Sequence, residues 1–280
     1  MITNNQIRMA LIAIASLNMF AASGQSNYQQ ANSNVSYGEV TELPYSPAAH
    51  EFSYGEDSSQ IGRLWLANPA FPAGRSVIFI HGGCWLNQFD MKHTFPLASA
   101  LAQAGFNVWS LEYRRTGDKG GGWPGSYNDV KAGIQYISAL AEYKITIENS
   151  VIVGHSAGGH LALLAGQEFP SSKAVIGLAA ITNVISYSQG NNSCETATPS
   201  FMGGTFQKQP SQYRAATPTE SLLHNTTQLL HGSSDEIVNI QQSVLEGAET
   251  EILQDAGHFD WVHPGTTAFN LFLNKLEALF

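Results

Sequence analysis

The stretch Val151–Gly166, VIVGHSAGGHLALLAG, most constrains what this chain folds into. It indicates a short apolar strand, a tight turn and then a helix. The turn, residues 154–158, fits the G-x-S-x-G pattern, in which a serine stands on a sharp strand-to-helix turn with its hydroxyl clear of the sheet. Glycine is needed at both ends of the pattern because a side chain there would collide with neighbouring backbone. The positive end of the following helix faces the hydroxyl. The stretch therefore predicts Ser156 as a nucleophile.

Short strands and helices alternate on both sides of this stretch. Strands are predicted at 51–54, 63–67, 76–80, 106–112, 174–181, 228–231 and 249–253, and helices at 96–104, 129–141 and 266–280. The run SVIFI is apolar throughout, as in strands buried on both faces of a parallel sheet. The alternation predicts an α/β fold over residues 50–280, with a mostly parallel central sheet and helices on both faces.

A pair of glycines follows SVIFI directly, in the segment His81–Trp85, HGGCW. Consecutive glycines after a buried strand let the backbone turn its N–H groups toward one point, and such a loop supplies oxyanion-hole donors. The predicted donors are the N–H groups of Gly83 and Cys84, joined by that of Ala157. A plain Gly-Gly turn is the alternative, and the serine motif downstream favours the oxyanion hole. His81 is expected to brace this loop rather than to carry protons.

Two further side chains complete a catalytic set with Ser156. Asp235 follows the strand predicted at 228–231, and His258 follows the strand predicted at 249–253. Both lie just past a strand's C-terminal end, where ligands bind in open α/β sheets. The serine needs a base, and the imidazole needs a carboxylate that fixes its tautomer. The order Ser, Asp, His along the chain is the one expected of the α/β-hydrolase fold.

Other acidic and imidazole side chains compete less well for these roles. Asp260 and His263 lie near the catalytic histidine, but Asp260 is only two residues away and poorly placed to orient its ring. His160, on the helix after the nucleophile, is expected to pack or to form a hydrogen bond. Asp129 is expected to open a helix and to form a structural pair with Arg114.

Composition narrows the class of partner. The formal net charge is −9, and lysine and arginine do not cluster anywhere in the 280 residues. This argues against nucleic acid or an anionic membrane as a partner. No Cys/His group has zinc-ligand spacing, so no metal site is expected. A small molecule is the expected partner.

The N-terminal part is predicted to lie outside the fold. Arg8 precedes the apolar run Met9–Ala22, which is shorter than the about 20 residues that a membrane span needs. Small residues follow, so residues 1–24 have the order of a secretory signal peptide, with a buried helix as the alternative. Residues 25–49 are expected to be a polar, flexible leader. The chain is therefore expected to be exported, to the periplasm or outside the cell.

The polar stretch 189–214 is expected to be an irregular, lid-like loop above the strand ends. It carries Cys194, and the chain's other cysteine, Cys84, lies in the glycine-containing segment 81–85. Export would permit a disulfide between them, which would tie the lid to the predicted oxyanion hole. A packed free thiol at Cys84 is the alternative.

The segments HGGCW, YRR, GHSAGGH, HGSSDEIV and AGHFDWVHP occur in an order and spacing that carry a family resemblance. They resemble the α/β-hydrolase group that contains kynurenine formamidases (arylformamidases) and carboxylesterases of the feruloyl- and acetyl-esterase kind. The likeness covers about residues 50–280. It implies a serine hydrolase with the triad Ser156, Asp235 and His258 and with no cofactor.

Expected export favours ester cleavage through an acyl-enzyme over the alternative, hydrolysis of N-formylkynurenine. A non-catalytic binding module of the same fold is a third hypothesis. Aromatic side chains flank the catalytic loops, and some are expected to line an apolar pocket for a small aromatic or short acyl group. Those expected to bind substrate are Trp85, Trp123, Phe201 and Phe259.

Overall fold

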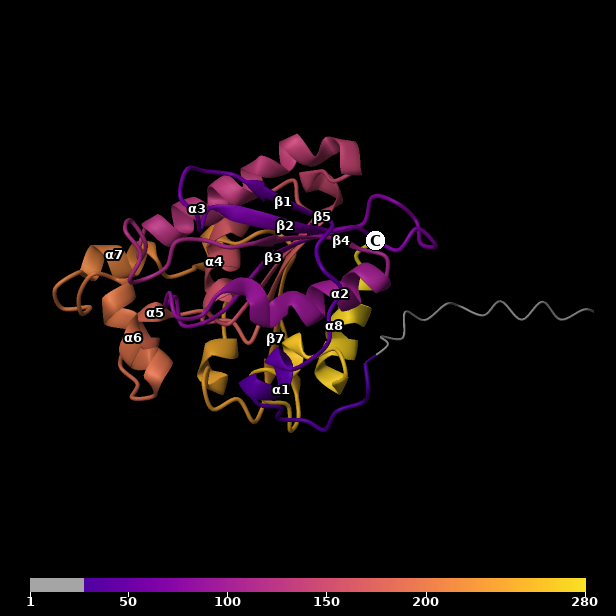
Figure 1. Cartoon of the computed structure of the whole chain (residues 1–280). Helices are drawn as coiled ribbons and strands as arrows, with labels where there is room; N and C mark the ends of the chain where they lie inside the picture. Colours follow the sequence, from indigo (N-terminus) through magenta and orange to yellow (C-terminus); the bar gives the residue numbers. More distant parts are fainter. Residues whose placement is uncertain (1–27) are drawn as a thin grey trace, which may run out of the picture.

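Eight strands form one sheet in the computed structural model, which describes residues 28–280 (Figure 1). Their order across the sheet is β1-β2-β4-β3-β5-β6-β7-β8. β1 and β2 pair in antiparallel fashion with their neighbours, and β3 to β8 are parallel, which confirms the predicted mostly parallel sheet. The bounds are β1 His50–Ser53, β2 Ile61–Trp65, β3 Ser76–Ile80, β4 Asn107–Leu111, β5 Ser150–His155, β6 Ala174–Leu178, β7 Thr227–Gly232 and β8 Glu249–Leu253.

Helices cover both faces of this sheet because each central strand is apolar on both sides. In β3, Ile78 and Ile80 join the core beneath α3 (Gly125–Gln135) and α4 (Ala157–Gly166). Val77 and Phe79 point the other way, into the core beneath α2 (Phe95–Gln103) and α8 (Thr267–Glu277). The remaining α-helices are α1 Tyr37–Thr41, α5 Val184–Tyr187, α6 Ser193–Phe201 and α7 Pro210–Ala215. Short 3-10 helices span Met91–Thr94, Tyr136–Tyr143, Ile147–Asn149, Glu220–Leu222, Ile240–Ser243 and Asp260–Val262.

The strand register brings the predicted catalytic loops to one edge of the sheet. Ile80 at the end of β3 is paired with Gly154 of β5, and Gly154 is paired with Gly177 of β6. β7 and β8 continue in parallel beyond β6. The loops that leave β3, β5, β7 and β8 therefore start from the same edge, where open α/β sheets bind ligands.

Residues 28–49 differ from the expected flexible leader. Val35 and Val40 are buried, and the Tyr28 hydroxyl donates hydrogen bonds to the carbonyls of Pro44, at 2.8 Å, and Pro96, at 3.1 Å. α1 begins in a capping box between Ser36 and Glu39. The expectation was wrong because buried valines and hydrogen bonds to the rest of the domain together hold this polar segment in place. The predicted signal peptide, residues 1–24, lies outside the described residues.

The segment 189–214 is helical rather than irregular. α6 begins in a capping box between Asn192 and Glu195, and α7 follows it. In Figure 1, α5, α6 and α7 lie together at one end of the molecule. The expected irregular loop is thus a small group of helices.

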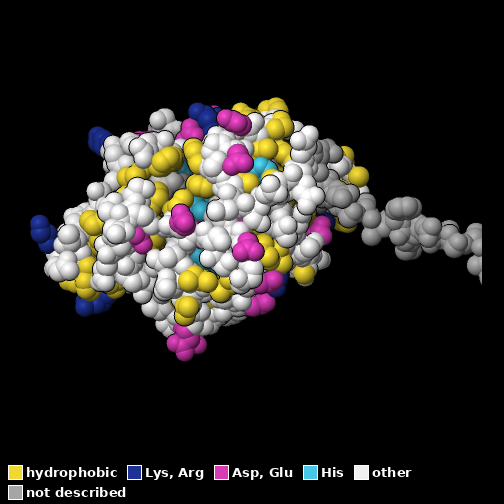
Figure 2. Space-filling model, turned by 90° about the horizontal axis from the view of Figure 1, so that it is seen from below, with side chains coloured by type: hydrophobic (Ala, Val, Ile, Leu, Met, Phe, Trp, Pro, Cys, Tyr) yellow, Lys and Arg dark blue, Asp and Glu magenta, His cyan; other side chains and the backbone are white. Residues whose placement is uncertain are grey.

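The surface shows no strong concentration of positive charge on the face drawn in Figure 2. Acidic and hydrophobic side chains are interspersed there, whereas lysine and arginine side chains lie near its margin. Within residues 28–280, none of the helices has the length and apolar character that crossing a membrane requires.

Candidate active site

Ser156 stands on the turn between β5 and α4. Its backbone has φ 57° and ψ −122°, a conformation that non-glycine residues rarely adopt and that is found at functional sites. The turn is fixed by hydrogen bonds from Ser156 N to Leu178 O, at 2.9 Å, and from His160 N to Ser156 O, at 3.1 Å. A Cβ atom on Gly158 would lie 2.2 Å from the carbonyl oxygens of both Ile80 and His81. The motif's glycine is therefore required because α4 packs directly on the end of β3.

Asp235 and His258 form a buried pair. The distance from His258 Nδ1 to Asp235 Oδ2 is 2.7 Å. The other carboxylate oxygen accepts the N–H groups of Ile237, at 2.9 Å, and Val238, at 2.8 Å. Burial alone would raise the pKa of Asp235, but His258 and the Val238 N–H outweigh it, so the pKa lies below its ordinary value. The ionised carboxylate therefore accepts the Nδ1 proton of His258 and leaves Nε2 free to act as a base.

Ser156 and His258 line the same cavity, which has a volume of about 350 Å³. His155 supports this arrangement, because its Nε2 atom lies 2.9 Å from the carbonyl oxygen of His258 and the two rings are 4.6 Å apart. Burial is the main reason that the pKa of His155 lies well below its ordinary value, so the ring is neutral and donates this bond. The predicted serine, base and acid thus meet at one site.

The glycine loop, residues 81–85, is the predicted source of oxyanion-hole donors, and its backbone conformation is unusual. Gly83, Cys84 and Trp85 all have positive φ, at 111°, 54° and 57°. Among residues 28–280, no acceptor pairs with the N–H groups of Gly83, Cys84 and Ala157, so these donors are free for a ligand oxygen. Gly83 and Cys84 line the cavity that holds Ser156. Each such donor is typically worth ~10²–10³ in rate.

His81 braces this loop, as expected. Its Nε2 atom lies 2.9 Å from Oε1 of the buried Glu112. Glu112 also accepts the N–H groups of Met91 and Tyr113, both at 3.0 Å, and the Tyr113 hydroxyl donates to the His81 carbonyl at 2.9 Å. The loop after β3 is therefore fixed from beneath by one carboxylate.

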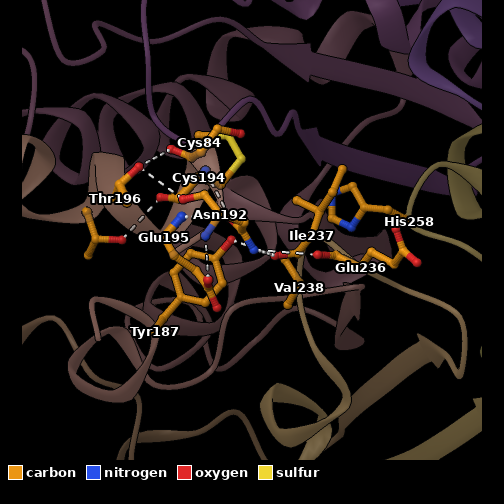
Figure 3. Close-up of a disulfide and its surroundings, with 12 residues drawn as sticks. Cys84, Tyr187, Asn192, Cys194, Glu195, Thr196, Glu236, Ile237, Val238 and His258 are labelled. Atoms are coloured by element: carbon orange, nitrogen blue, oxygen red, sulfur yellow. Dashed lines mark hydrogen bonds between the residues drawn. A yellow bond between two sulfur atoms is a disulfide. The ribbon is translucent and has the colours of Figure 1, made fainter. Parts of the chain in front are cut away.

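A disulfide joins Cys84 of the glycine loop to Cys194 of α6, with a Cα–Cα distance of 5.0 Å (Figure 3). The alternative of a free thiol at Cys84 does not hold. The segment before and including α6 also contacts the loop that follows Asp235. Asn192 Nδ2 and the Tyr187 hydroxyl both donate to the Ile237 carbonyl, at 2.9 and 3.0 Å. The segment from Tyr187 to α6 therefore links the loop that contains Cys84 to the loop that follows Asp235.

Of the four aromatic residues expected in the substrate pocket, Phe259 lines the cavity and three lie elsewhere. Trp85 and Phe201 are fully buried and stack on each other at 4.5 Å. Trp123 stacks on Tyr127 at 5.5 Å. These three rings pack the helical segment onto the sheet domain. Other side chains in the cavity wall, which are not among these four, include Tyr37, Leu86, Phe89, His93, Ser193 and Ile237.

The competing polar residues have structural partners. Arg114 binds Asp129 through two hydrogen bonds of 2.8 and 2.7 Å, as expected. His160 Nε2 lies 2.6 Å from the Ala216 carbonyl, which agrees with the expectation that this ring packs or forms a hydrogen bond. Asp260 accepts three backbone N–H groups, whereas the ring of His258 is hydrogen-bonded to Asp235. Within residues 28–280, no group of three His, Cys, Asp or Glu side chains is placed to hold a metal ion.

Comparison with known proteins identifies the family. The model of the BD-FAE family matches residues 69–246, so the chain belongs to that family. Esterases LipC and LipQ of Mycobacterium tuberculosis are 27% and 26% identical to it over 80% and 78% of this chain. The chain spans 64% and 53% of the length of these two relatives. The kynurenine formamidase of Meyerozyma guilliermondii is 26% identical over 69% of this chain and 76% of its own.

Solved structures support the α/β-hydrolase fold. Esterase B from Lactobacillus rhamnosis has a TM-score of 0.67 at 17% identity, and the match covers 86% of this chain and 90% of the other. A truncated carbohydrate esterase from gut microbiota has a TM-score of 0.66 at 23% identity, with 84% and 96% covered. At these identities the likeness concerns the fold.

The predicted triad leads to a first testable prediction. Ser156→Ala should fold normally and lose on the order of 10⁶ in kcat on an ester substrate, because the nucleophile is gone. Asp235→Asn should lose about 10⁴, because the amide no longer holds His258 in the correct tautomer. Steady-state kinetics and thermal melting measure both effects.

Asp260→Asn is the matched control for the acid. It removes an acceptor of backbone N–H groups and should lower the free energy of unfolding, while kcat falls far less than in Asp235→Asn. A larger loss of kcat in Asp260→Asn than in Asp235→Asn would show that the acid is wrongly assigned.

The buried ring of His160 generates a second prediction. Burial lowers its pKa from 6.5 to about 4, so the folded protein binds this proton less readily than the unfolded chain. The stability that the neutral ring contributes is complete above about pH 6.5 and is lost as the pH falls toward 4. In urea titrations at pH 7.5 and 5, the wild type should lose about 2 kcal/mol more than His160→Gln. Equal losses would contradict the buried, neutral state.

Proposed function

We propose that this protein is a serine carboxylic-ester hydrolase that cleaves esters of small aromatic or short acyl groups. The observation that carries the proposal is the buried Asp235–His258 pair, which shares one cavity with a serine on a strained turn. The two mycobacterial relatives named as esterases support ester cleavage. The family of the chain agrees with this class.

In the proposed reaction, acyl transfer takes place in two steps. His258 Nε2 takes the Ser156 proton while the serine oxygen attacks the ester carbonyl. The N–H groups of Gly83, Cys84 and Ala157 stabilise the negative oxygen of the tetrahedral intermediate. His258 then gives the proton to the leaving alcohol, and water repeats the sequence on the acyl-enzyme. Asp235 stabilises the charged imidazole in both steps.

Formamide hydrolysis is the second candidate because the Meyerozyma kynurenine formamidase aligns with most of this chain. Both reactions would use the same nucleophile and the same oxyanion donors, so the cavity decides between them. Its wall is mainly apolar and includes Leu86, Phe89, Ile237 and Phe259. Such a wall suits an uncharged ester better than the charged amino-acid group of N-formylkynurenine.

Two measurements test this proposal. A fluorophosphonate probe should label Ser156 in the folded wild type and not in Ser156→Ala, whereas an unlabelled wild type would favour a non-catalytic binding module. Acetyl, feruloyl and longer acyl esters should then be compared with N-formylkynurenine at equal concentration. The esters should be turned over faster, and faster turnover of the formamide would overturn the ester assignment.

We also propose that the chain is exported. The Cys84–Cys194 disulfide supports this, since such bonds persist mainly in oxidising compartments. In protein made in an oxidising compartment and denatured without reductant, both thiols should be protected from alkylation. After reduction, alkylation should add two alkyl groups by intact mass. Reduction should also lower the free energy of unfolding by roughly 4 kcal/mol. Two reactive thiols before reduction would contradict the bond.

A further inference from the structure

Tyr37 reaches the active-site cavity from a segment far from the catalytic residues in sequence. It lies on α1, outside the residues 69–246 that match the family model, and it lines the cavity with Ser156 and His258. Its ring is 5.8 Å from Phe89 and 5.5 Å from Phe259, in edge-on contact with both. The N-terminal segment therefore supplies the central ring of an aromatic cluster in the cavity wall.

The segment that carries Tyr37 is fixed to the loop of the catalytic histidine. Asp260 Oδ2 accepts Asn34 N at 2.7 Å and Gly257 N at 2.9 Å, and its other oxygen accepts Val35 N at 2.8 Å. The chain passes so close that a Cβ atom on Gly257 would lie 2.2 Å from Asn34 Oδ1. One buried carboxylate thus joins the residues just before α1 to those just before His258.

The position of the cluster relative to His258 indicates which part of an ester it meets. Phe259 directly follows His258, and the two rings are 5.0 Å apart. In acyl transfer the leaving alcohol takes its proton from this histidine, so it lies against the histidine side of the cavity. Tyr37 extends that side because it contacts Phe259.

We propose that Tyr37 is a specificity-determining residue, and that with Phe89 and Phe259 it forms an aromatic subsite for the alcohol group of the ester. This inference rests on the proposed ester hydrolysis. Aromatic rings favour a flat partner in edge-on or offset contact over a small alkyl group. The subsite therefore selects esters of aromatic alcohols, while the acyl group occupies another part of the cavity.

Three esters distinguish an effect on the alcohol group from an effect on the acyl group: 2-naphthyl acetate, ethyl acetate and ethyl 2-naphthoate. Hydrolysis of each ester is measured by the release of acid. In Tyr37→Ala the ratio of kcat/KM for 2-naphthyl acetate to that for ethyl acetate should fall about 10-fold, through KM, because the central ring is lost. The ratio of ethyl 2-naphthoate to ethyl acetate should stay within about 2-fold. Tyr37→Phe keeps the ring and should restore the wild-type preference.

Tyr45→Ala is the matched control. Tyr45 is an exposed tyrosine on the same N-terminal segment, and it contacts Phe95 rather than the cavity. Tyr45→Ala should keep both kcat/KM ratios at their wild-type values, and thermal melting should show that all variants fold. An unchanged naphthyl acetate ratio in Tyr37→Ala, or a loss confined to ethyl 2-naphthoate, would overturn the inference. A wild type that hydrolyses none of the three esters and leaves Ser156 unlabelled would instead overturn the proposed function.

Discussion

The direct contact of α4 with the ends of the central strands is the constraint on which the active site depends. A Cβ atom on Gly154 would lie 2.2 Å from Gly158 O, and one on Gly158 would meet the carbonyls of Ile80 and His81. Only glycine permits this approach, and the approach forces Ser156 into positive φ. The strain is sustained because the surrounding hydrogen bonds and the parallel strands leave the turn no other conformation.

Three buried carboxylates organise the loops around that turn. Glu112 holds the loop after β3 through His81, Asp235 holds the ring of His258, and Asp260 joins the N-terminal segment to the residues before His258. Each also accepts at least one backbone N–H group, so its charge is stabilised where burial alone would disfavour it. The loops are therefore fixed by charge-assisted hydrogen bonds, whereas the sheet beneath them is fixed by apolar packing.

The sheet, the nucleophile turn and the pairing of Asp235 with His258 could be predicted because each depends on local pattern and chain order. The cavity wall could not, since it depends on which rings turn inward. Trp85 and Phe201 flank catalytic loops yet stack on each other, while Tyr37 reaches the site from 28–49, a segment expected to be flexible. The two segments whose structure was predicted wrongly, 28–49 and 189–214, both carry a sequence signal for a helix. Ser36 with Glu39, and Asn192 with Glu195, have the spacing of a capping box, which predicts a helix start.

α6 and α1 both lie outside the sheet and contribute to the cavity wall, but their links to the reacting groups differ. Cys84 lines the cavity from the loop after β3 and is joined to α6 by its disulfide. If the Cys84 N–H acts as the proposed oxyanion donor, a shift of α6 would move this donor and change the rate on every ester. Tyr37 supplies a ring to the cavity wall, and its segment is held by Asp260, which also accepts Gly257 N next to His258. The Asp235–His258 hydrogen bond itself involves no residue of α1. Substitution on α1 can consequently alter which ester fits while the triad stays in place.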